Sequence, residues 1–180
     1  SYGEKFINKG DEILTTELEH HSNYVPWNFL REKKGAVIKF APVNEDGEIE
    51  IDEIMKLMSS KTKMIAITHL SNVTGAITPL KKIVDLAKTK KIPILVDGTQ
   101  GAPHLKIDMQ ELGCDFYAIS CHKMYGPNGL GILYAKKKWL DVLPPYQGGG
   151  GMIDEVTKES VTYAEAPTKF EAGTGQTAEV

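Results

Sequence analysis

The feature that most constrains the fold is an uninterrupted apolar run at residues 92–96, which stops at Asp97. Such a run is typical of a strand in a parallel sheet that helices cover on both faces. Segments with helical spacing separate it from five further apolar or alternating segments, at 12–16, 36–43, 63–68, 116–119 and 131–135. This alternation predicts an α/β fold with a mostly parallel sheet between two layers of helices.

The segments between the strands carry signals for helix ends. Residues 24–34 place apolar side chains at helical spacing, carry basic residues in the last turn and stop at Gly35. Asp52 is predicted to cap a short helix that runs to Met58. Thr78 and Pro79 predict the start of a longer helix, with Thr78 as the cap and Pro79 in the first turn.

The length of 180 residues suits one domain with a sizeable core. From Pro144 onward the sequence becomes rich in Pro and Gly, with four consecutive glycines at 148–151. We therefore expect a single domain over 1–180, in which 1–143 form the α/β core and 144–180 form an excursion from the sheet. Because the first residues resemble the end of a helix, we expect a piece of a longer protein, truncated at both ends.

Composition argues against several classes of protein. A net charge of −3 with a pI near 6.0 argues against nucleic acid as a partner. The longest apolar runs, about seven residues, are far shorter than a membrane span. Cys114 and Cys121 lie at the two ends of one predicted strand, too far apart for a disulfide, which favours the cytoplasm. No metal is predicted, since no zinc-type ligand spacing occurs.

Polar residues follow four of the predicted strands. They are the clusters at 19–23, 69–74, 97–100 and 120–123. The carboxyl ends of parallel strands lie at one edge of a sheet, where ligands bind in open α/β folds. The clusters offer imidazole, amide, carboxylate, hydroxyl and amine groups, and together they predict a binding site at this edge.

Lys123 considered alone has two interpretations. It is a solvated surface amine, the common case for lysine, or an amine that forms a Schiff base with an aldehyde cofactor. Asp97 considered alone has three interpretations: a helix cap, a metal ligand or a nucleophile. As a pair they suit pyridoxal 5'-phosphate (PLP), which needs a lysine for its aldehyde and a carboxylate beside its protonated pyridine nitrogen.

Other reactive side chains are assigned smaller roles. His20 suits stacking on a flat cofactor ring, with an exposed loop histidine or half of a metal site as alternatives. His69 is interpreted as a strand-end histidine with satisfied hydrogen bonds. Cys121 lies inside the predicted site, where a thiol near lysine and histidine can be reactive, but we assign it no catalytic role.

Several segments in order resemble a known family: EHHSN at 19–23, ITHLSNVTG at 67–75, VDGTQGAPH at 96–104, DFYAISCHKMYGPNGLGILY at 115–134 and FEAGT at 170–174. They are similar to the group II cysteine desulfurase and selenocysteine lyase family, in the class V aminotransferase group of fold-type-I PLP enzymes. The resemblance covers essentially the whole chain. Its most specific part is VDGxQ followed by SxHKxYGP.

The resemblance implies four roles around the cofactor ring. Lys123 would hold the PLP aldehyde and later shuttle a proton. Asp97 would pair with the pyridine nitrogen, and Gln100 would donate to the phenolic oxygen. His20 would stack on the ring and serve as an acid or base.

The resemblance also implies contacts at the edge of the cofactor and between subunits. Asn72 would contact the cofactor with its substrate, and Ser120 and His122 would hold the phosphate. Thr174 would reach the phosphate of the partner subunit in a homodimer. The implied reaction removes sulfur from L-cysteine, gives L-alanine and an enzyme persulfide, and supplies a sulfur-acceptor protein or iron-sulfur cluster assembly.

The sequence departs from the family pattern in ways that leave alternatives open. Relatives of this type usually have glycine where this chain has Cys121, and the persulfide-forming cysteine and substrate-binding arginine are expected downstream of Val180. Selenocysteine lyase remains an alternative, as does another class V enzyme such as a kynureninase-like lyase or an aminotransferase. A catalytically incompetent, cofactor-binding fragment is the alternative outside catalysis.

Overall fold

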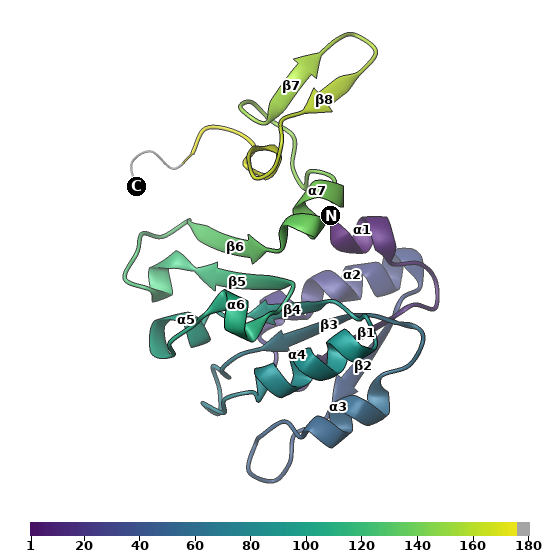
Figure 1. The fold of residues 1–180 in the computed structure, drawn as a ribbon, viewed down its shortest axis with the longest axis vertical. Coiled ribbons are helices and arrows are strands. Elements are labelled where there is room, and N and C mark those ends of the chain that lie inside the picture. The colour runs from purple at the N-terminus through teal and green to yellow at the C-terminus, as the bar shows by residue number, and fades with distance from the viewer. Residues whose placement is uncertain (176–180) are drawn as a thin grey trace.

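The computed structural model describes residues 1–175 of the chain. Six strands form one sheet in the order β2-β1-β3-β4-β5-β6 (Figure 1). They are β1 (Glu12–Thr16), β2 (Val37–Ala41), β3 (Thr62–Thr68), β4 (Ile94–Asp97), β5 (Phe116–Ser120) and β6 (Gly131–Ala135). Every neighbouring pair is parallel except β5 and β6, which confirms the mostly parallel sheet.

Helices occupy most of the connections between strands. The α-helices are α1 (Tyr2–Phe6), α2 (Val25–Lys34), α3 (Ile51–Leu57), α4 (Leu80–Thr89), α5 (Gly101–His104), α6 (Met109–Leu112) and α7 (Lys137–Val142). Three short 3-10 turns are η1 (His21–Asn23), η2 (Cys121–Lys123) and η3 (Thr168–Phe170). Within the described part of the chain, no helix combines the length and apolar character that crossing a membrane requires.

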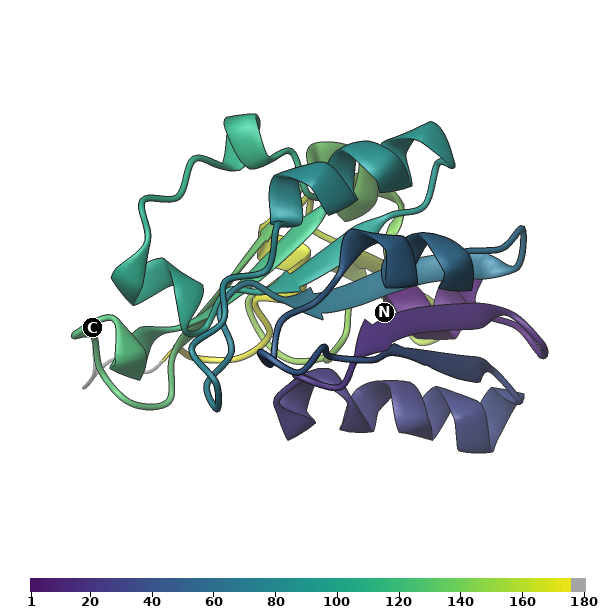
Figure 2. The same ribbon diagram turned by 90° about the horizontal axis from the view of Figure 1, so that it is seen from below.

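Neighbouring residues of an inner strand face opposite cores. In β3, Ile65 and Ile67 pack in a cluster with residues of α3 and α4, whereas Met64 and Ala66 pack in a second cluster with residues of α2. Figure 2 shows α3 and α4 on one side of the sheet and α2 on the other. All four β3 side chains are buried, so this strand is covered on both faces, as a parallel sheet requires.

The direction of travel along the sheet reverses between β1 and β3. From β1 the chain passes through α2 to β2 at the edge, and then returns through α3 to β3 on the other side of β1. Such a switch point leaves a crevice at the carboxyl ends of the strands. His20 follows β1 and Asn72 follows β3, so two predicted site residues flank this crevice.

Two predicted helix caps are wrong. Helix α3 has Glu50 at its N-cap position, so Asp52 lies inside the first turn. Helix α4 has Pro79 at its N-cap position, and the buried Thr78 Oγ1 has no hydrogen-bond partner among the described residues. The backbone N–H of Thr78 instead donates to His69 over 2.9 Å. This pairing fixes where the chain enters α4.

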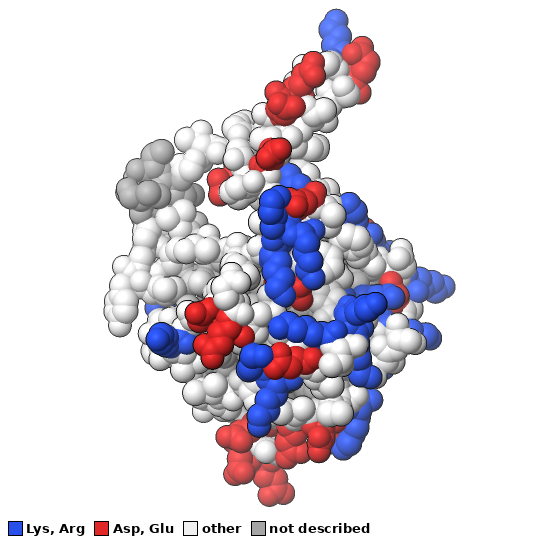
Figure 3. All heavy atoms as spheres, viewed as in Figure 1, with Lys and Arg blue, Asp and Glu red and all other residues white. Residues whose placement is uncertain are grey.

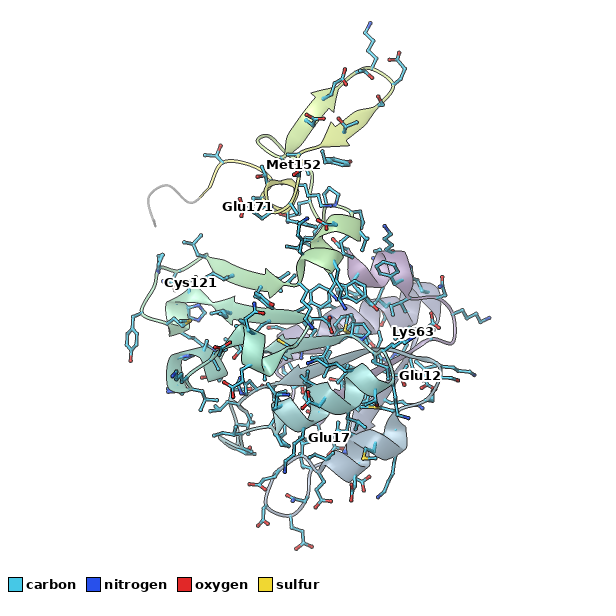
Figure 4. All side chains as sticks on the ribbon, viewed as in Figure 1. Glu12, Glu17, Lys63, Cys121, Met152 and Glu171 are labelled. Atoms are coloured by element: carbon cyan, nitrogen blue, oxygen red, sulfur yellow. The ribbon has the colours of Figure 1, made fainter. Side chains whose placement is uncertain are left out.

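The part after α7 projects from the sheet as a two-stranded hairpin, β7 (Ile153–Val156) and β8 (Val161–Tyr163) (Figure 1). Met152, at the base of the hairpin, is buried (Figure 4). The β7 and β8 side chains themselves are exposed. The division of the chain at residue 143 stays a prediction.

Charges of both signs share the face seen in Figure 3. Acidic side chains gather along the hairpin and around α3 with the loop before it, and basic side chains cross the middle of this face. The acidic group near α3 includes the exposed residues Glu45, Asp46, Glu48 and Asp52. This face is therefore not uniformly basic or acidic.

Candidate active site

Residues from the ends of β1, β3, β4 and β5 line one cavity of about 430 Å³. The structure brings seven of the eight predicted site residues to it: His20, Asn72, Asp97, Gln100, Ser120, His122 and Lys123. The eighth, Thr174, is exposed and is not among the lining residues. The strand-end clusters thus converge, while the individual roles of these residues stay predictions.

Asp97 is held at the centre of this edge by the strand pairing. It is the last residue of β4 and lies opposite Thr68 of β3 and Ala118 of β5. The backbone N–H of Thr99 donates to Asp97 Oδ1 over 3.0 Å. This bond ties the carboxylate to the turn that follows β4 and that carries Gln100.

Lys123 reaches the cavity from η2, the 3-10 turn directly after β5. Its side chain is half-buried, and no carboxylate within residues 1–175 lies at ion-pair distance from it. On the same segment, Ser120 Oγ and His122 Nδ1 share a hydrogen bond of 2.9 Å. One short segment therefore supplies an amine, a hydroxyl and an imidazole.

His20 is oriented by the turn that it caps. The backbone N–H of Ser22 donates to His20 Nδ1 over 3.2 Å, and Ser22 Oγ lies 2.8 Å from the same nitrogen. Because Nδ1 accepts, the hydrogen of the neutral ring lies on Nε2. His20 thus presents a donor nitrogen on the side of the ring away from its own loop.

Glu19 does not line the cavity, but its carboxyl holds together the segments that carry His20 and Thr68, a role that the sequence did not predict. Its carboxyl accepts hydrogen bonds from Thr16, Asn23 and the backbone of Thr68. Burial raises the pKa of Glu19 to about 7, and the negative charge of Asp97 adds to this effect. The signal in the sequence was a carboxylate at the start of a polar cluster after a strand.

Neither cysteine is placed as a nucleophile of this cavity. Cys121 is not among the lining residues, and its side chain lies beside the connection between β5 and β6 (Figure 4). Cys114 is fully buried, and burial raises the pKa of its thiol to about 11. Both thiols are free. In the described residues no group of three or more His, Cys, Asp and Glu side chains is arranged to hold a metal ion.

The cavity fits PLP in size and in chemistry. Its volume lies in the range of small-molecule sites, roughly 300–1,000 Å³. The carboxylate of Asp97 ends β4, and the amine of Lys123 lies in the turn after the neighbouring strand β5, so the cavity offers the two groups that the PLP pyridine nitrogen and aldehyde require. Hydroxyl and imidazole donors at Ser120 and His122 suit a phosphate group.

Comparisons with known proteins agree with this chemistry. A probable cysteine desulfurase of Halalkalibacterium halodurans is 49% identical over 174 residues, which are 97% of this chain and 43% of the relative. The structure of the cysteine desulfurase CsdA of Escherichia coli matches with a TM-score of 0.96 and 38% identity, over 99% of this chain and 45% of that one. A lysine-to-alanine variant of C-DES, with glycine covalently linked to its PLP cofactor, matches with a TM-score of 0.84 and 29% identity. The match covers 94% of this chain and 46% of that one.

The chain spans less than half the length of these relatives. The family model for class V aminotransferases matches residues 1–180. The parallel sheet and the polar cavity at its carboxyl edge agree with that match, and the chain therefore belongs to the aminotransferase class-V family.

Proposed function

We propose that the full-length protein is a PLP-dependent cysteine desulfurase, which converts L-cysteine to L-alanine and leaves the sulfur as a persulfide on an enzyme cysteine. The observation that carries this proposal is that Asp97 at the end of β4 and Lys123 in the turn after β5 line one cavity. The similarity to cysteine desulfurases supports the choice of substrate.

The carboxyl edge of the sheet would bind and polarise the cofactor. When bound, PLP supplies an electron-accepting ring for the substrate's α-carbon. Asp97 would hold a proton on the pyridine nitrogen and so keep the ring cationic, and Gln100 would donate to the phenolic oxygen. Ser120 and His122 would bind the phosphate.

Lys123 and His20 would move protons. Lys123 would hold the aldehyde until L-cysteine displaces it, and would then remove the α-proton of the substrate. His20 would stack on the ring and exchange a proton through Nε2, the nitrogen that the contacts of Nδ1 leave protonated. Asn72 would contact the bound substrate from the β3 side of the cavity.

The sulfur acceptor within the enzyme would be a cysteine outside residues 1–180. Cys114 is buried with a raised pKa, which keeps its thiol protonated near neutral pH. Cys121 is not among the residues that line the cavity. Both facts support a third cysteine in the remainder of the full-length protein, where we also place the substrate-binding arginine.

We further propose a cytoplasmic homodimer that passes sulfur to an acceptor protein, for example in iron-sulfur cluster assembly. Thr174 would reach the phosphate of the partner subunit's PLP, and its exposure away from the chain's own cavity supports this role. The free thiols of Cys114 and Cys121 suit a reducing compartment.

The test is turnover of L-cysteine by the purified full-length protein with PLP. The proposal predicts L-alanine and sulfide in equal amounts when a reductant releases the persulfide. Lys123→Ala should lower the rate by about 10²- to 10⁴-fold. Lys106→Ala, which removes an exposed lysine outside the cavity, is the matched control and should keep the rate.

The substrate separates the alternatives. A much higher rate with L-selenocysteine would identify a selenocysteine lyase, and turnover of kynurenine or of an amino-group acceptor would identify another class V enzyme. No turnover of any of these by the PLP-loaded full-length protein would overturn the proposal.

A further inference from the structure

A hydrogen-bonded pair of aromatic side chains lies beneath the turn that follows β4. His69 follows β3 and Tyr117 lies in β5, so they come from the two strands that flank β4. His69 Nδ1 and Tyr117 Oη are 2.8 Å apart, and the rings meet edge to face with centroids 5.9 Å apart. Both side chains are buried, and neither lines the cavity.

The turn lies directly on these two rings. A Cβ atom added to Gly98 would lie 1.8 Å from a ring carbon of Tyr117, and one added to Gly101 would lie 2.8 Å from His69 Nδ1. Neither glycine has a left-handed φ, so the close approach to the rings, rather than backbone conformation, requires glycine at both positions.

The same two strands also fix the backbone of the turn. The N–H of His69 donates to the carbonyl of Asp97, and the N–H of Gly98 donates to the carbonyl of Ala118, each over 2.9 Å. These two hydrogen bonds fix the backbone of the turn relative to β3 and β5, and the two rings support the turn from the side that faces the core. Asp97 precedes Gly98 and Gln100 follows it, and both residues line the cavity.

Both members of the pair are uncharged at neutral pH. Burial lowers the pKa of His69. Burial raises the pKa of Tyr117 well above its ordinary value. A neutral, satisfied hydrogen bond can be buried at little cost, and it fixes one relative orientation of its partners. Two apolar side chains would fill the same space but would not fix one relative orientation.

We propose that His69 and Tyr117 are positioning residues, which hold the turn so that Asp97 and Gln100 keep their orientation toward the cofactor. This inference rests on the proposed function, because it concerns PLP in the cavity. It assigns a role to two side chains that touch neither cofactor nor substrate.

The test compares Tyr117→Phe with Tyr134→Phe in the full-length protein. Tyr134 lies opposite Tyr117 in the β5–β6 register, is half-buried, and makes no side-chain hydrogen bond within the described residues. The dissociation constant for PLP and the ratio of the visible absorption bands of bound PLP are measured at one pH. The bands report the protonation state of the bound cofactor, which the contacts of Asp97 and Gln100 with it would influence.

Tyr117→Phe should raise the dissociation constant for PLP by about 3- to 10-fold, the effect of one hydrogen bond, and should change the band ratio. Tyr134→Phe should leave both at the wild-type values. A second comparison uses His69→Asn, whose amide can take the place of Nδ1, and His69→Leu, which cannot form the bond. Asn should preserve the wild-type dissociation constant and band ratio, and Leu should match Tyr117→Phe.

The proposal is overturned if Tyr117→Phe and Tyr134→Phe give the same dissociation constant and band ratio. Should Tyr117→Phe fail to fold, equal values for His69→Asn and His69→Leu overturn it in the same way. If the wild-type protein takes up no PLP, the proposed function itself has failed. The two failures are thus distinguished by the wild-type spectrum.

Discussion

The backbone N–H of Thr68 donates a hydrogen bond of 3.0 Å to the side-chain carboxyl of Glu19. Strand β1 ends at Thr16, so the Glu19 carboxyl takes the place of a strand partner at the end of β3. Thr16 and Asn23 each donate to the same carboxyl over 2.6 Å. Glu19 thereby fixes the loop that carries His20 and closes the sheet beside Asp97, the register partner of Thr68.

This arrangement makes the stability of the cofactor-free protein depend on pH through Glu19. Burial raises the pKa of its carboxyl from 4.5 to about 7, so the folded state binds this proton more tightly than the unfolded state. The stabilisation that protonated Glu19 gives to the folded state is therefore complete below pH 4.5. It is lost as the pH rises to about 7, and the total loss is at most about 3 kcal/mol. Glu19→Gln should remove this dependence.

The measurement is the difference in free energy of unfolding between wild type and Glu19→Gln at pH 5, 6, 7 and 8. The difference should fall with rising pH up to about 7 and stay constant above it. Glu45→Gln, at an exposed carboxyl, provides the matched control. A difference that does not vary across this range would show that Glu19 titrates at its ordinary pKa.

A methyl group at Gly98 should break the contact between the turn and the sheet. Gly98→Ala would place Cβ 1.8 Å from a ring carbon of Tyr117, whose side chain is fully buried. We expect a loss of about 1–3 kcal/mol or more in unfolding free energy and weaker PLP binding. Gly148→Ala, with no atom within 4 Å of the new Cβ, should have little effect. Equal thermal midpoints for the two variants would contradict this account.

Asp115 should be a structural carboxylate that joins β5 to α7. It accepts a hydrogen bond of 2.9 Å from Trp139 Nε1, and Lys136 and Lys138 lie within 3.3 Å and 3.1 Å of it. Asp115→Ala should lower the unfolding free energy by about 2–4 kcal/mol, because it leaves Trp139 Nε1 and the backbone N–H of Ile94 without this acceptor. Asp141→Ala, which breaks an exposed ion pair with Lys137, should cost less than about 1 kcal/mol.

The pKa of Asp115 gives a second check on that account. Burial acts to raise this pKa, but the hydrogen bonds from Trp139, Lys138 and Ile94 and the charge of Lys136 outweigh it, so the pKa lies below 3.8. Its contribution to stability is therefore present above pH 3.8 and is lost as the pH falls through the lowered value. A wild-type advantage over Asp115→Ala that is already lost at pH 5 would contradict this assignment.

Cys121 should be dispensable for the chemistry, despite its place two residues before Lys123. Its side chain packs near Gly126 and is not part of the cavity wall. Cys121→Ser should keep PLP affinity and desulfurase rate within about 2-fold, as for other substitutions away from a site. Loss of the persulfide in Cys121→Ser, detected by alkylation and mass spectrometry, would instead make this cysteine the sulfur acceptor.

Local sequence patterns predicted most of the fold. The strands at 12–16 and 131–135 have the predicted bounds, because apolar or alternating runs there are flanked by turns and glycines. The position of Lys123 and Asp97 at one edge followed from the rule for parallel strands. His69 is a strand-end histidine with a satisfied hydrogen bond, as predicted.

What the sequence could not predict depends on contacts between distant residues. The predicted caps at Asp52 and Thr78 were wrong. At Thr78, the hydrogen bond of its backbone N–H to His69, rather than a local capping preference, sets where the chain enters α4. The bonds from Glu19 to Thr68 and from His69 to Tyr117 join residues 49 and 48 positions apart. No local periodicity signals such pairs.

We propose that Lys123 carries the cofactor in the cavity that it shares with Asp97. The most direct measurement is borohydride reduction of the PLP-loaded full-length protein, followed by digestion and mass spectrometry. We expect a PLP-modified peptide that contains Lys123, and loss of both the modification and the reducible visible absorption band in Lys123→Ala. A reducible band that persists in Lys123→Ala, or a modification on a different lysine, would contradict it.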